Sequence, residues 1–580
     1  MLSFRNTFMT VYKGRLYPNY WDIIALLLAL SVIILLAWNA KQMSVPYHLG
    51  QPTPISLEPR FLPGYAMRTV LRMLIALFCS LLFTFVFATW AAKSRRAARI
   101  IIPVIDILQS VPILGFLSIT VVGFIAIFPN SMLGPECAAI FVIFTSQAWN
   151  MALGFYQTVR AVPAELKEAS VMFHLSAWQR FWRIDVPFSM PGLLWNMMMS
   201  MSAGWFFVVA SEAISVANQQ ILLPGIGSYI ATAIKTADIN AIWYAIFAML
   251  VVILLYDQLL FRPLIAWADK FKAEQVAQER EVNSWVVNML HRTRMLRYVG
   301  KKCANLFDSF VNAAMFRSQP KSYSVVARRL RSQAAFAWIW NVILTVSILA
   351  ALFFIGDFLY RNVSFSAVRE VFVLGLITAT RVFVSIIFCS LLWVPIGIWI
   401  GLRSRVAEFV QPIAQFLAAF PANLLYPIFV VAIIKYHMNV QVWVTPLMVL
   451  GAQWYVLFNV IAGASVIPKD LLQAADNFGV SYWLRWRRLL LPAVFPYYIT
   501  GAITAVGGAW NASIVAEVVS WGDKKLVATG LGAYISQYTA AGDFVHIALG
   551  ISMMCVLVLV FNRLIWRPLY VLAETRYQLD

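Results

Sequence analysis

Long apolar segments alternate with short basic segments along almost the whole chain. A helix needs roughly 20 apolar residues to cross a hydrocarbon core of about 30 Å, and segments of about that length recur from end to end. They predict an all-α polytopic membrane protein with about 12 transmembrane helices, in two sets of six. The first six lie near residues 22–38, 67–91, 100–128, 134–158, 189–212 and 240–262, and the second six near residues 337–358, 370–400, 406–434, 441–464, 495–517 and 545–563.

Basic residues indicate how these helices are oriented. They gather in the loops around residues 93–99, 160–183, 403–405 and 469–488, which all fall on one side of the predicted membrane. Cytoplasmic loops carry an excess of Lys and Arg, so we expect this side and both chain termini to face the cytoplasm.

Composition agrees with a membrane protein and argues against several other classes. Of the 580 residues, 61% are hydrophobic and 12% are charged, whereas a soluble domain has about 45–50% apolar and about 25% charged residues. The formal charge of +20 is spread over short clusters between apolar segments, so it indicates topology rather than nucleic-acid binding. Five scattered cysteines without a CxxC pair, and five isolated histidines, predict neither a disulfide framework nor a metal site.

Between the two sets lies a segment, near residues 263–333, that no spanning helix can occupy. Apolar positions from Val286 to Phe310 recur in it at helical spacing, while Arg292, Lys301 and Lys302 take the other face. Such a helix either lies on anionic lipid headgroups or packs against the membrane helices of its own chain.

The chain is therefore divided into six regions. We expect an N-terminal tail with the first transmembrane helix and an external loop (1–65), a first membrane core (66–263), a cytoplasmic basic linker with an amphipathic helix (264–336), a seventh transmembrane helix with an external loop (337–369), a second membrane core (370–568) and a cytoplasmic tail (569–580).

The two cores are copies of one another. A shift of 305 residues superposes many positions, among them Pro163 on Pro468, Trp178 on Trp483, Pro187 on Pro492, Trp205 on Trp510, Glu212 on Glu517 and Gly225 on Gly530. Nearer the start of each core the shift is 309 residues, which puts Arg72 on Arg381 and Pro112 on Pro421. Six helices separate equivalent positions, so both halves have the same orientation, as in a parallel repeat about an axis along the membrane normal.

A spaced motif occurs in the same cytoplasmic loop of both halves. The first copy contains Glu168, Ala169, His174 and Pro187, and the second contains Gln473, Ala474, Ala475, Gly479 and Pro492. Small alanines allow another surface to approach closely, a glycine permits a left-handed turn, and a proline suits the start of the next helix. This spacing resembles the EAA loop of binding-protein-dependent ABC permeases, although His174 stands for the glycine and Gln473 for the glutamate.

The resemblance implies a function for both loops. In that family the loop seats in a groove of a separate ATPase subunit and transmits its closure, so the two cores would be ABC permease cores that bind two ATPase subunits. The segments 411–421, 508–517 and 530–535 further resemble the nitrate, sulfonate, taurine and bicarbonate branch. That branch implies import of a small, mostly anionic solute, delivered by an extracytoplasmic binding protein, across a bacterial cytoplasmic membrane.

No chemistry of its own is expected in this chain. It contains no GxxxxGK[ST] loop, so the resemblance implies that ATP and magnesium are bound by the partner ATPase, and it contains no HExxH or GxSxG motif. We expect a non-catalytic subunit without cofactors. The alternative is a secondary transporter, which also shows a repeat but has no need of an ATPase-docking loop.

Five residues are candidates for the outer part of a translocation path between the halves: Trp205, Glu212, Trp510, Asn511 and Glu517. An ionisable residue at the end of an apolar segment suggests function, and both glutamates are either gate elements or packing carboxylates. The tryptophans either line the path or sit at the membrane interface. Arg72 and Arg381 either guide an anion inward or extend to the headgroups.

Overall fold

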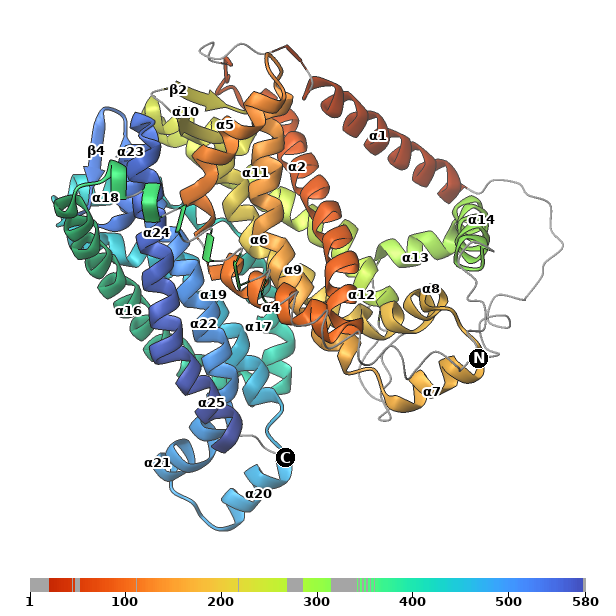
Figure 1. The fold of residues 1–580 in the computed structure, drawn as a ribbon. Coiled ribbons are helices and arrows are strands. Elements are labelled where there is room, and N and C mark those ends of the chain that lie inside the picture. Colours follow the sequence, from red (N-terminus) through yellow and green to blue (C-terminus); the bar gives the residue numbers. More distant parts are fainter. Residues whose placement is uncertain are drawn as a thin grey trace. The chain divides into compact units, whose positions relative to one another are not determined.

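The computed structural model describes residues 20–43, 45–46, 53–110, 112–216, 219–268, 285–313 and 360–576, with scattered positions between 342 and 358. The chain is mostly helical (Figure 1). Contacts within the chain divide it into two units. The first comprises residues 1–38, 161–194 and 256–321, and the second comprises residues 39–160, 195–255 and 322–580. The second unit holds most of both membrane cores.

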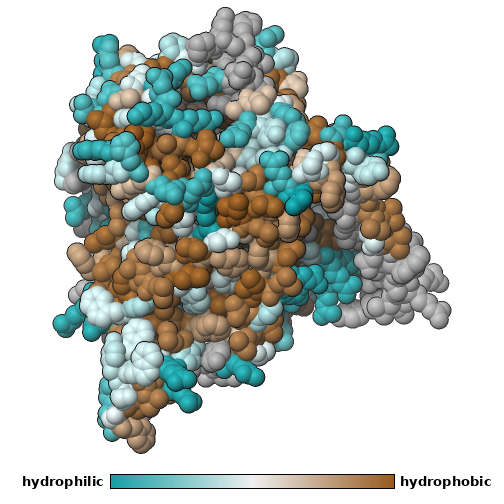
Figure 2. All heavy atoms as spheres, turned by 90° about the vertical axis from the view of Figure 1, so that its left-hand side faces the viewer, coloured by the Kyte–Doolittle hydropathy of each residue, from teal (hydrophilic) through white to brown (hydrophobic). Residues whose placement is uncertain are grey.

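Eight helices of the described residues are long and apolar enough to cross a membrane. They span Pro59–Lys93, Leu133–Arg160, Ala177–Ser211, Ile239–Ala268, Phe365–Gly401, Val440–Ser465, Tyr482–Ala516 and Phe544–Ala573. Each contains all or most of one predicted segment, so the all-helical polytopic class is confirmed. Figure 2 shows a broad apolar band on the face where α16 (Phe365–Gly401) lies.

Two predicted spans are broken in the structure. In the first half the segment forms α4 (Arg95–Ser110), η3 (Ile113–Phe116) and α5 (Leu117–Ile127). In the second half it forms α17 (Ser404–Ala419), η9 (Ala422–Leu424) and α18 (Tyr426–Lys435), with a bend of 72° at the break. The prediction of one continuous helix in each place is wrong.

Proline explains both breaks. Pro112 and Pro421 are equivalent in the repeat, and both have extended ψ values, 116° and 113°. Proline lacks the N–H that a helix needs and disfavours helical conformation in the preceding residue, so the chain leaves the helix there.

The first predicted span is a helix, α1 (Tyr20–Gln42). The seventh, near residues 337–358, lies outside the described residues except for scattered positions, so the total of twelve stays a prediction. The spanning helix Ile239–Ala268 ends with α12 (Arg262–Ala268), and the described part of the linker then contains α13 (Trp285–Arg292) and α14 (Arg294–Val311).

Four π-helical segments recur with the same shift of 305 residues. They are η4 (Phe181–Asp185), η5 (Asp257–Phe261), η10 (Trp486–Leu490) and η11 (Asn562–Trp566). Each is followed two residues later by a proline: Pro187, Pro263, Pro492 or Pro568. A wider turn just before a residue without an N–H lets the helix continue where a regular helix would lose a hydrogen bond.

A short β-hairpin follows the long helix of each half, and the sequence analysis did not predict it. The first pairs β1 (Ala213–Val216) with β2 (Gln219–Leu222), and the second pairs β3 (Val518–Trp521) with β4 (Lys524–Val527). The second turns at Gly522, whose φ of +55° suits glycine. Each hairpin leads into a short helix, α10 (Ile226–Lys235) or α23 (Leu531–Ala541).

The hairpins also connect the halves. Strand β1 packs against α23 of the second half as well as α10 of its own, and β3 packs against α10 as well as α23. The backbone N–H of Gly522 donates a hydrogen bond of 2.8 Å to the carbonyl of Ile234 on α10. Buried Ile214 and Ile221 belong to the same hydrophobic core as Val519 and Leu531.

Candidate functional site

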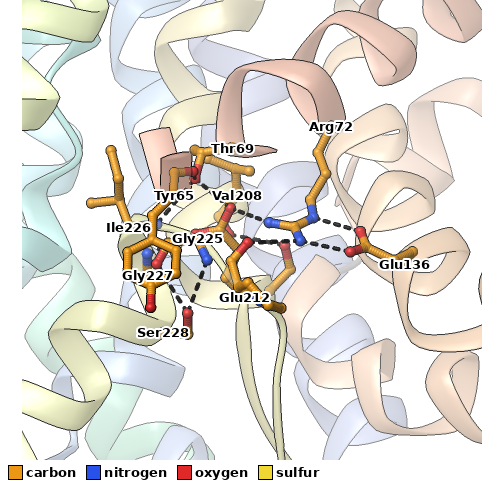
Figure 3. A network of polar contacts seen from close by, with 12 residues as sticks. Tyr65, Thr69, Arg72, Glu136, Val208, Glu212, Gly225, Ile226, Gly227 and Ser228 are labelled. Atoms are coloured by element: carbon orange, nitrogen blue, oxygen red, sulfur yellow. Dashed lines mark hydrogen bonds and ion pairs between the residues drawn. The ribbon is translucent and has the colours of Figure 1, made fainter. Parts of the chain in front are cut away.

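A fully buried arginine organises the first half. Arg72 lies on α2 (Leu62–Phe83), and its guanidinium points between two carboxylates (Figure 3). Its Nε and Nη2 donate to Glu136 on α6 (Leu133–Arg160) over 2.6 and 2.7 Å, and its Nη1 donates to Glu212 over 2.6 Å. Nη2 also donates to the carbonyl of Pro224. This geometry satisfies the charge that burial would otherwise make very costly.

Glu212 joins three elements at the end of α9 (Val186–Ser211). Its Oε1 lies 2.6 Å from the hydroxyl of Thr69, and its Oε2 accepts a 2.6 Å hydrogen bond from the N–H of Gly227, at the start of α10. A negative charge is favourable at a helix N-terminus. A Cβ atom at Gly225 would lie 2.3 Å from this carboxylate, so only glycine fits there.

The second half repeats the arrangement around Arg381, which is 8% exposed. Its Nη1 donates 2.9 Å to Glu517 and 2.8 Å to the carbonyl of Thr529. The Thr378 hydroxyl lies 2.8 Å from Glu517 Oε1, and the N–H of Ala533 donates to Oε2. Glu517 therefore ties the hairpin and α23 to α16, as Glu212 ties its own hairpin and α10 to α2.

The two networks differ in charge. Arg381 Nη2 donates to the amide oxygen of Gln441 over 2.6 Å, and Gln441 occupies the position of Glu136 in the repeat. Half-buried Arg68, which interacts electrostatically with Glu136, is replaced by Ile377 in the second half. The negative charge of Glu136 and the positive charge of Arg68 are thus both absent from the second half, which keeps each network close to neutral.

The two networks exclude one of the interpretations that the sequence left open for Arg72 and Arg381. Arg72 and Arg381 do not extend to the headgroups, because both are buried and bound to glutamates, so that interpretation is wrong. Glu212 and Glu517 are both 0% exposed, and they join elements of their own half. Trp205 and Trp510 are buried as well, at 1% and 2% exposed.

Asn511 instead lies where the halves meet. Its Oδ1 accepts a 2.7 Å hydrogen bond from the N–H of Ile113, at the helix break of the first half. The reverse contact joins Asn423, at the break of the second half, to the carbonyl of Phe206 on α9 over 3.1 Å. Ser202 also donates to the carbonyl of Ala418. The sequence analysis missed Asn423 and Ser202, although the repeated prolines mark both breaks.

The first EAA-like loop lies in the first unit. Helix α7 (Ala164–Met172) ends in a turn at His174, whose φ is +51°, and α8 (Ala177–Arg180) follows. The N–H of His174 donates to the carbonyl of Val171, and that of Leu175 to Ser170. This pair of bonds is a Schellman motif, which ends a helix at a left-handed residue.

The second loop has the same construction. Helix α20 (Lys469–Asn477) ends at Gly479, whose φ is +62°, and α21 (Tyr482–Arg485) follows. The N–H groups of Gly479 and Val480 donate to the carbonyls of Asp476 and Ala475. The predicted left-handed turn is therefore confirmed in both copies, with histidine adopting it in the first.

The other motif residues lie where the spacing puts them along the loops. Glu168 and Ala169 are on α7, and Gln473, Ala474 and Ala475 are on α20. Pro187 and Pro492 are the second residues of α9 (Val186–Ser211) and α22 (Leu491–Ala516), as predicted for a proline at the start of a helix. The π-helical turns η4 and η10 join these helices to α8 and α21.

The fold and the repeated loops define a multi-pass helical membrane protein made of two homologous halves. Residues 80–261 and 394–566 each match the family described as binding-protein-dependent transport system inner membrane component. These matches cover more than half of the chain, so the protein belongs to this family and carries two copies of its domain in tandem.

Individual relatives match one part of the chain. The chain is 29% identical over 156 residues to the bicarbonate transport system permease protein CmpB of Synechococcus elongatus, and the aligned segment covers 27% of this chain and 53% of CmpB. It is 26% identical over 185 residues to the nitrate import permease protein NrtB of Leptolyngbya laminosa, and this alignment covers 32% of this chain and 63% of NrtB. It is 26% identical over 159 residues to the glycine betaine/proline betaine transport system permease protein ProW of Escherichia coli, and this alignment covers 27% of this chain and 44% of ProW. The chain spans about half the length of the curated relatives it matches.

Proposed function

We propose that this chain is the membrane permease subunit of an ABC importer. The observation that carries the proposal is the duplicated loop, in which a short helix ends in a Schellman motif at His174 or Gly479. Each loop leads into a long helix, Ala177–Ser211 or Tyr482–Ala516. A rigid helix that begins at the loop and ends at a hairpin suits the transmission of movement across a membrane.

Two separate ABC ATPase subunits are the proposed partners at these loops. They would bind ATP and magnesium, while the contact on this chain would involve Glu168, Ala169, His174 and Pro187 in the first half. The equivalent contact in the second half would involve Gln473, Ala474, Ala475, Gly479 and Pro492. The basic residues beside both loops support a cytoplasmic position in a bacterial inner membrane, with both termini on the same side.

The translocation path is proposed to run between the halves. The helix breaks near Ile113 and Asn423 contact the long helix of the opposite half through Asn511 and Phe206. Broken helices supply free backbone groups at membrane depth only where they are buried or line a cavity. Polar groups at these breaks are therefore suited to a solute that passes between the halves.

The hairpins are proposed to close the outer end of this path. They lie at the ends of the long helices opposite to the loops, and each packs on a short helix of the other half. The arginine networks anchor each hairpin firmly to its own half, through Glu212 and Glu517. A movement of one half would thus carry its hairpin away from the other half. In this account the two glutamates and the neighbouring Trp205 and Trp510 support the gate from within, rather than contacting the solute.

The names of the relatives give bicarbonate, nitrate and betaines as their solutes, all of which are small. We propose an anion, delivered by an extracytoplasmic binding protein. In support, the second hairpin exposes Lys524 and Lys525 where the first has Gln219 and Gln220. Cations at the outer face would attract an anion to the entrance.

Reconstitution tests this function against a secondary transporter. Cysteines placed at Ala169 and Ala474 should form cross-links to co-purified ATPase subunits, and uptake into vesicles should require ATP. Uptake driven by an ion gradient alone, with neither position reaching an ATPase, would establish the secondary transporter instead.

A further inference from the structure

The linker helix α14 contacts the first loop within the first unit. The ring of Phe307 meets that of Trp182 edge to face at 5.2 Å, and Phe310 meets Trp178 in the same way at 5.3 Å. Such edge-to-face pairs are directional as well as apolar. The contact is therefore a specific one between the end of α14 and the segment formed by α8 and η4.

A polar contact lies beside this aromatic contact, two residues further along the chain. The side-chain oxygen of Asn312, at the C-terminal end of α14, accepts hydrogen bonds from Gln179 over 3.1 Å and from Arg183 over 2.9 Å. The bond from Arg183 is assisted by charge, which makes it the stronger of the two. The linker thus packs against its own chain here, which is one of the two alternatives from the sequence.

The second loop differs at the equivalent positions. Trp483 corresponds to Trp178 and is 74% exposed, while Tyr482 beside it is 76% exposed. Arg487 replaces Trp182, and Leu484 replaces Gln179. The second loop therefore has neither a tryptophan at the position of Trp182 nor an amide at the position of Gln179, and its Tyr482 and Trp483 side chains are exposed.

We propose that α14 is a built-in partner of the first loop and makes the two ATPase-docking surfaces of the chain unequal. This rests on the proposed function, in which both loops dock ATPases. At the first loop the α8 side is occupied by α14, so an ATPase meets α7 alone there. At the second loop an ATPase meets α20 together with the open aromatic side chains of α21.

The contact itself can be tested without any ATPase. In a background in which the five native cysteines are replaced, Gln179→Cys with Asn312→Cys should form a disulfide in membranes on mild oxidation. Gln179→Cys with Lys301→Cys is the matched control, because Lys301 lies about 16 Å further along the same helix at a rise of roughly 1.5 Å per residue. A disulfide with Lys301→Cys but not with Asn312→Cys would overturn the proposed contact.

Accessibility then tests the inequality. In inside-out vesicles, a charged maleimide should label Leu484→Cys several-fold faster than Gln179→Cys. The double change Phe307→Ala, Phe310→Ala should remove this difference, whereas Asn305→Ala, on the opposite face of α14, should preserve it. Equal labelling in the intact chain, or no response to the double change, would overturn the proposal.

Adding the ATPase subunits completes the test. They should protect Leu484→Cys and leave the already slow labelling of Gln179→Cys unchanged. Equal protection of both positions, or of neither, would contradict unequal docking surfaces. A failure of the proposed function is recognised separately, because Ala169→Cys and Ala474→Cys would then form no cross-link to the ATPase.

Discussion

Glu136 and Gln441 occupy the same place in the two halves, each bound to a buried arginine, but only Glu136 carries a charge. The charge of Glu136 is accompanied by that of Arg68, which is replaced by Ile377 in the second half. A buried charge without a partner is strongly destabilising, whereas removing a whole pair often costs little. The two halves therefore offer a natural comparison of the same site with and without these two opposite charges.

Glu136→Gln should destabilise the protein by about 1–3 kcal/mol, because Arg72 keeps only one carboxylate and the positive charge of Arg68 is no longer offset by Glu136. Arg68→Ile added to it should recover much of this loss, because the first half then has the residues of the second. Unfolding in detergent, followed for the two single variants and the double variant, measures the coupling. Losses that simply add would mean that Arg68 and Glu136 act independently.

Glu212→Gln and Glu517→Gln should have unequal effects. Arg72 still has Glu136 after the first change, so a loss of about 1 kcal/mol is expected. Arg381 has no other carboxylate in its network, so Glu517→Gln should cost about 3–5 kcal/mol, as for a buried pair that loses one partner. Thermal unfolding of the purified protein compares them, and equal losses would contradict this difference between the networks.

Gly225→Ala and Gly530→Ala should each destabilise the protein by about 1–3 kcal/mol through overpacking. The added Cβ would lie 2.3 Å from a carboxylate oxygen of Glu212 or Glu517, and these carboxylates are held in place by several hydrogen bonds. Gly507→Ala is the matched control, since its Cβ would meet nothing within 4 Å. If Gly507→Ala and the other two variants lose the same amount of stability, the networks can move aside for the added Cβ and the prediction is contradicted.

Gly479→Val should reduce ATP hydrolysis that is linked to transport, whereas His174→Gly should be tolerated. A Cβ at Gly479 would meet no atom within 4 Å, so the penalty comes from its φ of +62°, which costs an ordinary residue about 1–2 kcal/mol. The first loop already accepts this strain at His174, and glycine there would relieve it. ATPase assays with the reconstituted complex check both changes, and a harmless Gly479→Val would mean that the turn does not contribute to coupling.

The sequence predicted features that are local or repeated better than those that depend on distant contacts. The left-handed turns at His174 and Gly479 were predicted, because a helix end and its turn involve only a few neighbouring residues. The breaks at Pro112 and Pro421 were missed, although both prolines were visible in the repeat, because the apolar pattern continues through them.

Pairing between distant residues could not be predicted in the same way. Arg72 and Glu212 are 140 positions apart, and each alone fits several roles in a membrane helix. The hairpins were missed because four-residue strands give too short a pattern, although a Gly-Asp pair, Gly522 and Asp523, is a typical hairpin signal. The contact of α14 with the first loop also depends on side chains far apart in the chain.

The central claim, that solute passes between the halves and that the hairpins close the outer end, is tested most directly by a reversible cross-link. A Cβ at Gly522 would lie 3.4 Å from the Cβ of Ala237, close to the usual Cβ separation of a disulfide, about 3.5–4.5 Å. In a background without native cysteines, oxidation of Ala237→Cys with Gly522→Cys should stop uptake into vesicles, and reduction should restore it. Each single variant controls for oxidation and for strain at Gly522. Unchanged uptake in fully cross-linked protein would contradict the account.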